Sequence, residues 1–121
     1  MLQLGTLLQT QGQYQKAIEQ YSRIPFENSE RAEAQYYIGE CYQLLKKDTE
    51  ARMAYEKFFS IQPRDSDYRI AGLLELAKIL SASGEDPRRL LATYEEIAAA
   101  SRNPEVALMA RQKAAELKGG K

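Results

Sequence analysis

The side chains that most often carry catalytic chemistry are scarce in this sequence. It contains no histidine and one cysteine, Cys41. Serine–histidine and cysteine–histidine nucleophilic sites are therefore impossible, and no cysteine-based zinc site can be built. Carboxylate pairs remain for acid–base work, at Glu95 with Glu96 and at Asp65 with Asp67. Adjacent helix residues diverge and the second pair falls in a predicted loop, so we interpret both as surface carboxylates.

The glycine-containing and basic motifs also indicate structure rather than a site. The segment from Gly84 to Pro87 is interpreted as a helix stop followed by a helix start, because it lacks the glycine-rich lysine pattern that cradles phosphate. Arg88 with Arg89 is too small a cationic spot for a nucleic-acid surface. Lys plus Arg and Asp plus Glu both number 17, so no charge excess directs the chain to nucleic acid or an anionic membrane. We expect no enzyme, no cofactor and no metal.

Size and composition are those of an ordinary globular domain. The 121 residues are enough for a modest core, with 44% hydrophobic and 28% charged residues. Apolar runs are far shorter than the roughly 20 residues that span a bilayer, so no membrane insertion is expected. A lone cysteine fits the cytosol without excluding the periplasm. The first residues lack the features of a signal peptide, and the compartment stays open between cytoplasm and periplasm.

One constant shift superimposes the first part of the sequence on the second. The matching pairs are Leu4 with Ile38, Gly5 with Gly39, Leu8 with Tyr42, Gln9 with Gln43, Ala17 with Ala51, Tyr21 with Tyr55 and Ile24 with Phe58. A looser third copy follows at a larger shift, and its extra residues are placed in the connection 62–67. Its pairs are Gly39 with Ala77, Tyr42 with Leu80, Lys46 with Gly84, Asp48 with Asp86, Tyr55 with Tyr94 and Phe58 with Ile97. A fixed period of about 34 residues indicates a repeat architecture.

Each copy is predicted to form two helices, because its apolar residues recur at spacings of three and four. The two best stripes are Ala34, Tyr37, Ile38, Cys41, Tyr42 and Leu45, then Ala51, Ala54, Tyr55, Phe58 and Phe59. Helix ends are predicted at Gly12 and Gly84, and helix starts at Asp86-Pro87 and Asn103-Pro104. Further N-terminal cap candidates are Asp48 and Asp67. The second helices of the first two copies are predicted to end at Pro25 and Pro63. We predict helices at 2–11, 14–24, 30–45, 48–61, 67–83, 87–101 and 104–118, and no strand.

These residues resemble the tetratricopeptide repeat. The second copy matches its pattern through Ile38, Gly39, Tyr42, Ala51, Tyr55 and Pro63, the first through Leu4, Gly5, Leu8, Ala17 and Tyr21, and the third departs at Ala77. The resemblance implies an all-α, right-handed α-solenoid with three helix hairpins plus one C-terminal helix. Residues 1–121 would form a single domain, with repeats at about 1–29, 30–66 and 67–103 and a terminal helix at 104–118. The small residues would lie where paired helices approach closely.

The segment 28–42 also has a narrower likeness. It carries the aromatic pair Tyr36 and Tyr37 before Gly39, and it is similar to repeats of bacterial cell-envelope proteins. This favours a bacterial source.

The resemblance also implies where a partner binds. In tetratricopeptide arrays the first helix of each hairpin lines a concave surface that holds the ligand. Carried over, the partner-binding residues are Thr6, Gln9, Glu33, Tyr36, Tyr37, Glu40, Gln43, Lys47, Leu74, Glu75, Lys78 and Ser81. Tyr36 and Tyr37 are the best anchors, because neighbours differ by ~100° around a helix and one of them must point away from the hairpin core. The alternative is that both tyrosines pack between repeats.

The charges on this surface have mixed signs. Glu33, Glu40 and Glu75 stand with Lys47 and Lys78, which either contact a partner of mixed or little charge or form weak ion pairs on a solvated face. Some arrays of this family capture a peptide carboxylate with basic and amide side chains. We do not expect that mode here, because Gln9, Gln43 and Ser81 occupy the positions concerned and acids accompany them.

Two functions are compatible with these features. The first is a protein-interaction scaffold that binds a partner peptide or protein on the concave face, with no nucleic acid. The second is an assembly segment of a longer solenoid, which self-associates as a homodimer through its end helices. Uncovered apolar residues favour the second reading: Leu2, Leu4, Leu7 and Leu8 at one end, and Val106, Leu108, Met109 and Leu117 at the other. On either reading we expect the chain to be a fragment of a longer protein.

Overall fold

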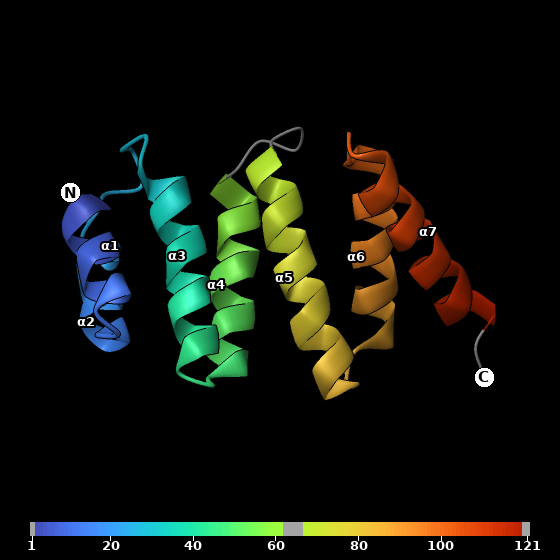
Figure 1. The fold of residues 1–121 in the computed structure, drawn as a ribbon, viewed down its shortest axis with the longest axis horizontal. Helices are drawn as coiled ribbons and strands as arrows, with labels where there is room; N and C mark the ends of the chain where they lie inside the picture. Colours follow the sequence, from blue (N-terminus) through green and yellow to red (C-terminus); the bar gives the residue numbers. More distant parts are fainter. Residues whose placement is uncertain (1, 62–66, 120–121) are drawn as a thin grey trace. The chain divides into compact units, whose positions relative to one another are not determined.

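The computed structural model describes residues 2–61 and 67–119. Within them the chain forms α-helices and no strand (Figure 1). The helices are α1 (Leu2–Thr10), α2 (Tyr14–Ser22), α3 (Arg31–Leu44), α4 (Asp48–Ile61), α5 (Asp67–Ser83), α6 (Pro87–Ala100) and α7 (Pro104–Gly119). Every predicted helix is present, and its ends lie within two residues of the prediction. The largest difference is at the end of α2, because the residue before Pro25 is disfavoured in helical conformation.

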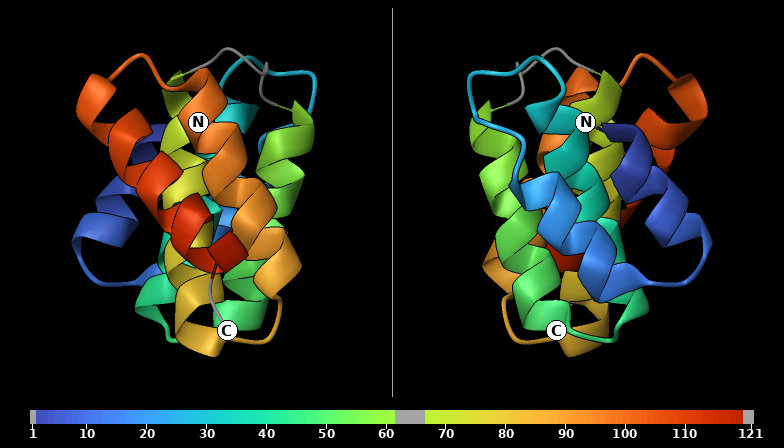
Figure 2. Two further views of the ribbon diagram at one scale, coloured as in Figure 1. Left: turned by 90° about the vertical axis from the view of Figure 1, so that its right-hand side faces the viewer. Right: turned by 90° about the vertical axis from the view of Figure 1, so that its left-hand side faces the viewer.

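The helices divide between two compact units, Met1–Gln62 and Pro63–Lys121, called unit 1 and unit 2 below. In unit 1 the hairpins α1/α2 and α3/α4 pack together through α2 and α3, and the right view of Figure 2 shows α1 and α2 side by side. In unit 2 α5 pairs with α6, and α7 packs on α6, as the left view shows. The all-α fold of helix hairpins with an added C-terminal helix is confirmed. The single domain and the repeat boundaries stay predictions.

Glycines end two of the first helices, as predicted. Gly12 follows α1 with φ 79°, and Gly84 follows α5 with φ 66°. This left-handed region is open to glycine at little steric cost. After α1 the Gln13 N–H donates to the Leu8 carbonyl at 2.9 Å, a bond that satisfies a helix-end carbonyl and sets the reversal into α2.

Two of the predicted helix starts are confirmed in detail. The Asp86 carboxylate accepts the Arg89 backbone N–H at 3.1 Å, one residue before Pro87 opens α6. The Asn103 side chain accepts the backbone N–H groups of Glu105 at 2.9 Å and Val106 at 3.3 Å. Such caps satisfy donors that have no partner within the helix. Asp48 is the first residue of α4 rather than the one before it, and Pro63 and the Asp67 side chain lie outside the described residues.

The core of unit 1 contains the two predicted apolar stripes together with residues of α2 and the connection after it. Its fully or nearly buried residues are Ala17, Ile18, Tyr21, Ile24, Ala34, Ile38, Cys41, Ala51, Ala54, Tyr55, Phe58 and Phe59, and Tyr37, Tyr42 and Leu45 pack against it half-buried. In unit 2 the buried residues include Leu73, Leu76, Ala77, Ile79, Leu80, Leu90, Tyr94, Ile97, Ala107, Ala110 and Ala114. The burial of these apolar side chains is the main favourable contribution to folding of each unit.

The close approach predicted at the glycines is made by a tyrosine ring. A Cβ added to Gly39 would lie 2.6 Å from Cε1 of Tyr55, and Gly5 stands in the same relation to Tyr21. Each tyrosine is fully buried and comes from the second helix of the same hairpin. The glycine is therefore required for the space that the aromatic ring fills.

Candidate protein-binding surfaces

Two of the predicted binding residues hold hairpins together. The Tyr21 hydroxyl donates to Oε1 of Gln9 at 2.8 Å, and the Tyr55 hydroxyl donates to Oε1 of Gln43. In each hairpin the tyrosine that covers the glycine thus reaches the glutamine one turn further along the first helix. Burial raises the pKa of Tyr21, with smaller contributions from Cys41 and nearby ionisable groups. The hydroxyl therefore stays protonated and remains the donor of this hydrogen bond. These glutamine oxygens are accordingly used within the fold.

Gln9 also links two hairpins. Its Nε2 donates to Oε1 of Glu40 at 3.1 Å, which connects α1 to α3. The Thr6 hydroxyl bonds to backbone carbonyls of its own helix, at 2.9 Å to Gln3 and 3.4 Å to Leu2. Both side chains are half-buried.

Tyr36 and Tyr37 point in different directions, and each packs on a neighbouring helix. The ring of Tyr37 lies 5.6 Å from that of Tyr21, centroid to centroid, and its hydroxyl donates to Glu33 at 3.0 Å. The ring of Tyr36 lies 5.7 Å from the rings of both Tyr55 and Phe58, in edge-to-face arrangements. Both tyrosines are half-buried. Each therefore combines packing between helices with a partly exposed face.

A cavity of about 370 Å³ lies on the side of α1 and α3. Its lining residues are Thr6, Gln9, Thr10, Tyr14, Tyr37 and Leu44. Three of them, Thr6, Gln9 and Tyr37, belong to the predicted surface. Leu44 was missed, although half of its surface is exposed and large exposed apolar side chains often mark interfaces. Lys47 lies in the turn after α3 and does not line this cavity.

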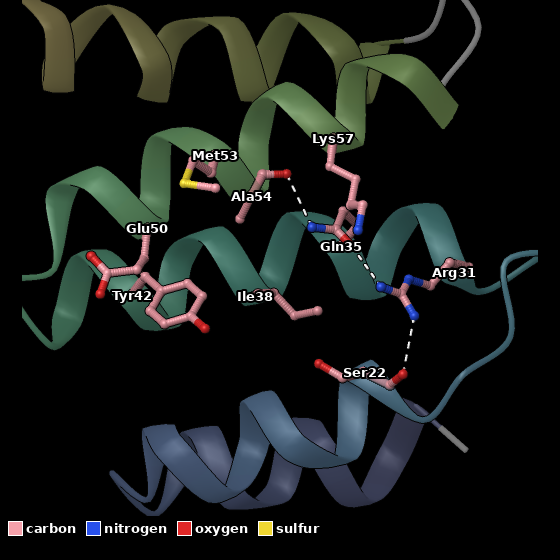
Figure 3. A pocket seen from close by; sticks show the side chains of 9 residues that line it. All are labelled: Ser22, Arg31, Gln35, Ile38, Tyr42, Glu50, Met53, Ala54 and Lys57. Carbon is pink, nitrogen blue, oxygen red and sulfur yellow. Dashed lines mark hydrogen bonds between the residues drawn. The ribbon is translucent and has the colours of Figure 1, made fainter.

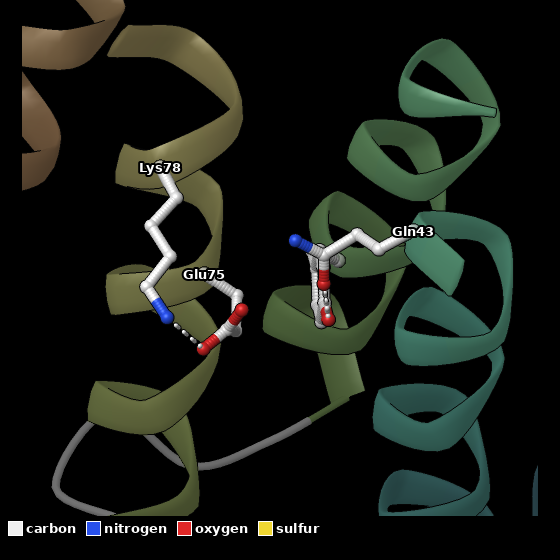
Figure 4. Close-up of polar contacts among 4 residues, drawn as sticks. Gln43, Glu75 and Lys78 are labelled. Atoms are coloured by element: carbon white, nitrogen blue, oxygen red, sulfur yellow. Dashed lines mark hydrogen bonds and ion pairs between the residues drawn. The ribbon is translucent and has the colours of Figure 1, made fainter. Parts of the chain in front are cut away.

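In unit 2 the predicted residues gather on α5. Lys78 and Glu75 form an ion pair at 3.2 Å (Figure 4), and with Leu74, Ala77, Tyr94 and Met109 they line a cavity of about 240 Å³. Lys78 is well exposed, so the pair contributes little to stability. Ser81 is exposed, and its hydroxyl lies 3.5 Å from that of Tyr94. A second cavity of about 480 Å³ is lined by Leu74 together with Ile70, Ala71, Ser101, Arg102, Asn103 and Val106.

A third surface was not predicted, and it lies between α2 and α4 alongside α3 (Figure 3). The groove has a volume of about 290 Å³, and its lining residues are Ser22, Arg31, Gln35, Ile38, Tyr42, Glu50, Met53, Ala54 and Lys57. None of them lines the cavity beside α1. Arginines are usually exposed, so nothing in the residue type indicated that Arg31 is buried here.

Arg31 connects three helices of unit 1. One guanidinium nitrogen donates to the carbonyl of Ser22, the last residue of α2, at 3.2 Å, and to the carbonyl of Ile24, just after α2, at 2.7 Å. Another donates to Oε1 of Gln35 at 2.8 Å, and Nε2 of Gln35 donates to the Ala54 carbonyl of α4 at 3.1 Å. The guanidinium nitrogen Nε has no acceptor among the described residues. Burial lowers the pKa of Arg31 below its usual value.

The one cysteine of the sequence lies inside unit 1. Cys41 is fully buried, and burial, with a smaller contribution from Glu40, raises the pKa of its thiol to about 12. A thiol that stays protonated is a poor nucleophile. No cluster of three or more metal-ligating side chains occurs among the described residues. In the same part of the chain, each helix is too short or too polar to cross a membrane.

Comparison with known proteins agrees with this architecture. The family model of the tetratricopeptide repeat matches residues 33–64, most of α3 and all of α4. The fold is that of a tetratricopeptide repeat protein. The predicted resemblance is therefore confirmed, and repeats of this kind generally mediate protein–protein interaction. The suggested bacterial source stays a prediction.

Among solved structures, the chain is similar to tetratricopeptide-like repeats of a protein from Podosopora anserina described as a kinesin light chain. The identity is 22% and the TM-score 0.65, over 96% of this chain and 63% of that one. A variant of the same protein gives the same identity and TM-score, over 96% and 62%. This chain thus spans less than two thirds of the length of these proteins. No curated protein matches it by sequence.

Proposed function

We propose that this protein is an interaction module that docks a segment of a partner protein along α1 and α3, the first helices of the hairpins in unit 1. The observation that carries the proposal is the cavity of about 370 Å³ beside α1 and α3, which brings together Thr6, Gln9 and Tyr37. Leu44, which is half-exposed, contributes an apolar surface to a lining that otherwise offers amide and hydroxyl groups. A few polar groups around an apolar anchor are the usual make-up of a binding site. We assign no enzymatic function.

Leu44 is the best position for a test. The tyrosines are less suitable, because replacing Tyr36 or Tyr37 would remove ring contacts that hold helices together. Leu44→Asp places a charge in the cavity without touching the core. Leu108→Asp on α7 is the matched control, because the two leucines are 51% and 50% exposed and Leu108 lines none of the cavities described.

The measurement is affinity capture of partners with the whole chain, followed by a binding constant for each captured protein. We expect Leu44→Asp to weaken binding by about tenfold or more, as truncation of a central apolar anchor does. Leu108→Asp should bind as the unsubstituted protein does. Equal recovery with Leu44→Asp would show that the partner uses another surface.

Self-association is the second candidate, and exposed leucines favour it. Leu4 and Leu7 on α1 are 48% and 53% exposed. A second copy would remove this apolar surface from water. Light scattering should then show a dimer that Leu4→Asp with Leu7→Asp converts to a monomer. A mass equal to one chain at all concentrations would exclude this role.

A further inference from the structure

Buried arginines occupy equivalent places in the two units, but their partners differ. The alignment of the second and third copies pairs Arg69 with Arg31, at the same shift that relates the rest of their first helices. Arg31 is 6% exposed and Arg69 is 8% exposed. In unit 2 Arg69 forms an ion pair with Glu96 of α6, at 2.5 Å from Nε to Oε2. The residue of unit 1 at the position of Glu96 would be the corresponding partner of Arg31.

That residue is Lys57, which the alignment of the second helices pairs with Glu96. Unit 1 thus has a cation where unit 2 has the carboxylate that neutralises the arginine. Within the described residues, neither Arg31 nor Lys57 forms an ion pair. A buried charge without an opposite charge is costly, since carbonyl and amide oxygens compensate it only in part.

Both cations lie close to one aromatic ring. The Arg31 guanidinium carbon lies 4.1 Å from the centroid of the Phe26 ring, and Nζ of Lys57 lies 5.1 Å from the same centroid. Phe26 is in the connection between α2 and α3 and is half-exposed. Both contacts are of the cation–π type, which concentrates positive charge around one solvent-facing ring.

The groove next to these cations has two chemically different ends. Figure 3 places Arg31 and Lys57 at one end and Glu50 at the other, with Ile38 and Met53 between them. Met53 is 66% exposed, which is the highest value among the large hydrophobic residues described. An occupant complementary to this groove has a negative charge at the first end and an apolar group in the middle.

We propose that the groove between α2 and α4 binds a segment of a partner protein in which an aspartate or glutamate is followed by an apolar residue. The carboxylate of that segment takes the place that Glu96 has beside Arg69, and is bound by Arg31 and Lys57. The apolar side chain covers Ile38 and Met53. Glu50 sets the direction of the segment by repelling its acidic end. This surface is additional to the cavity beside α1 and α3.

The test uses a charge exchange at Lys57. Lys57→Glu gives Arg31 the internal partner that Arg69 already has, so it should raise the melting temperature and exclude an external carboxylate. The probes are an acetylated, amidated Gly-Ser-Glu-Leu-Gly-Ser peptide and its counterpart with Gln in place of Glu. Lys16→Glu is the matched control, because Lys16 is exposed on α2 and does not line the groove. Binding is followed by NMR titration of the whole chain.

We expect the Glu peptide to shift the Arg31 side-chain and Lys57 signals, and to bind at least about tenfold more tightly than the Gln peptide. Lys57→Glu should lose this preference, Lys57→Gln should weaken it, and Lys16→Glu should keep it. Leu44→Asp should also keep it, which separates this site from the proposed docking surface. The inference is overturned by equal binding of both peptides, by equal losses in Lys57→Glu and Lys16→Glu, or by shifts at Leu44 instead of Arg31. Tighter binding of a phosphoserine peptide would overturn the assignment to a carboxylate.

Discussion

In the hairpin α3/α4 the ring of Tyr55 lies on Gly39, and its hydroxyl donates to Gln43. The hairpin α5/α6 has different residues at the same three places. Ala77 replaces the glycine, and Ser81 replaces the glutamine, with its hydroxyl 3.5 Å from that of Tyr94. The chain between the small residue and the tyrosine is one residue longer in unit 2 than in unit 1.

This difference shows which parts of the repeat depend on one another. Where the ring touches the backbone of the first helix, only glycine leaves the room, and the hydroxyl then reaches a long amide side chain. Where the chain from the small residue to the tyrosine is one residue longer, a methyl group is accommodated and a short hydroxyl side chain lies near the tyrosine hydroxyl. Tyr55 is fully buried, whereas Tyr94 is 9% exposed. The hairpin α3/α4 therefore has a tighter interface between its helices than α5/α6, and it should tolerate fewer substitutions at the small residue.

The largest effect is expected for Gly39→Val. Its Cβ would lie 2.6 Å from the buried Tyr55 ring, so either the ring or the helices must move. We expect a loss of about 3 kcal/mol in the free energy of unfolding, measured by urea denaturation. Gly119→Val is the control, since a Cβ there meets nothing within 4 Å. In unit 2 the reverse exchange, Ala77→Gly, should cost only about 1 kcal/mol of helix propensity. Equal losses at Gly39 and Ala77 would refute the difference between the hairpins.

The next effect concerns the buried arginines. Glu96→Lys makes unit 2 resemble unit 1, because it places a cation beside Arg69. Leu73 stands at the place of Gln35, so the guanidinium loses the Glu96 carboxylate and gains a repulsive neighbour. We expect a loss of about 2 kcal/mol, with faster amide hydrogen exchange in α5 and α6.

Glu95→Lys is the matched control for this substitution. Glu95 pairs with Lys118 at 2.9 Å, but both side chains are about half exposed or more, so the change should be small. Equal destabilisation by Glu95→Lys and Glu96→Lys would mean that total charge, and not the burial of Arg69, decides the result.

A smaller effect should appear at alkaline pH and only in unit 1. Cys41 is buried there, whereas the equivalent residue of unit 2 is Ile79. Burial raises the pKa of the Cys41 thiol from its ordinary 9.0 to about 12. The raised pKa adds stability below pH 9, and this is lost as the pH rises toward 12, because the unfolded chain releases the proton first. Between pH 9 and pH 10 we expect a loss of about 1 kcal/mol. Urea denaturation of Cys41→Ala should show a shallower decline, and an identical slope would contradict the assignment.

The helices were predictable because two local properties agree. Apolar spacing of three and four marks each helix, and Gly12, Gly84, Asp86 and Asn103 act at the ends through their own backbone preference or side chain. The third hairpin was also predictable as a looser copy. The different contact of its tyrosine with the first helix was not predictable, because the effect of one extra residue depends on the position of the ring in three dimensions.

The surfaces were less predictable. The position of residues on first helices follows from the repeat, and Thr6, Gln9 and Tyr37 line one cavity. The bonds that already occupy Gln9 and Gln43 did not follow, since they join residues of two helices. The role of Arg31 was missed for a related reason. The alignment of the copies pairs Arg31 with Arg69 and Lys57 with Glu96, but the sequence does not say that either arginine is buried.

The smallest predicted effect tests how the first helices end. Lys46 occupies the place of Gly12 in the first hairpin and of Gly84 in the third, and it has φ 62°. The N–H groups of Lys46 and Lys47 close the end of α3 by donating to carbonyls in its last turn. A lysine in this left-handed region is strained by about 1 kcal/mol, which glycine would remove, while the more flexible unfolded chain offsets part of the gain.

We therefore expect Lys46→Gly to raise the free energy of unfolding by about 0.5 kcal/mol, measured by urea denaturation. Gly84→Lys should lower it by about 1 kcal/mol in unit 2, since it introduces the same strain there. Lys47→Gly is the control for loss of a lysine side chain in the same turn, and it should not stabilise the protein. If Lys46→Gly is destabilising, the lysine side chain holds the turn through contacts that outweigh the backbone strain, and the three helix ends are not equivalent.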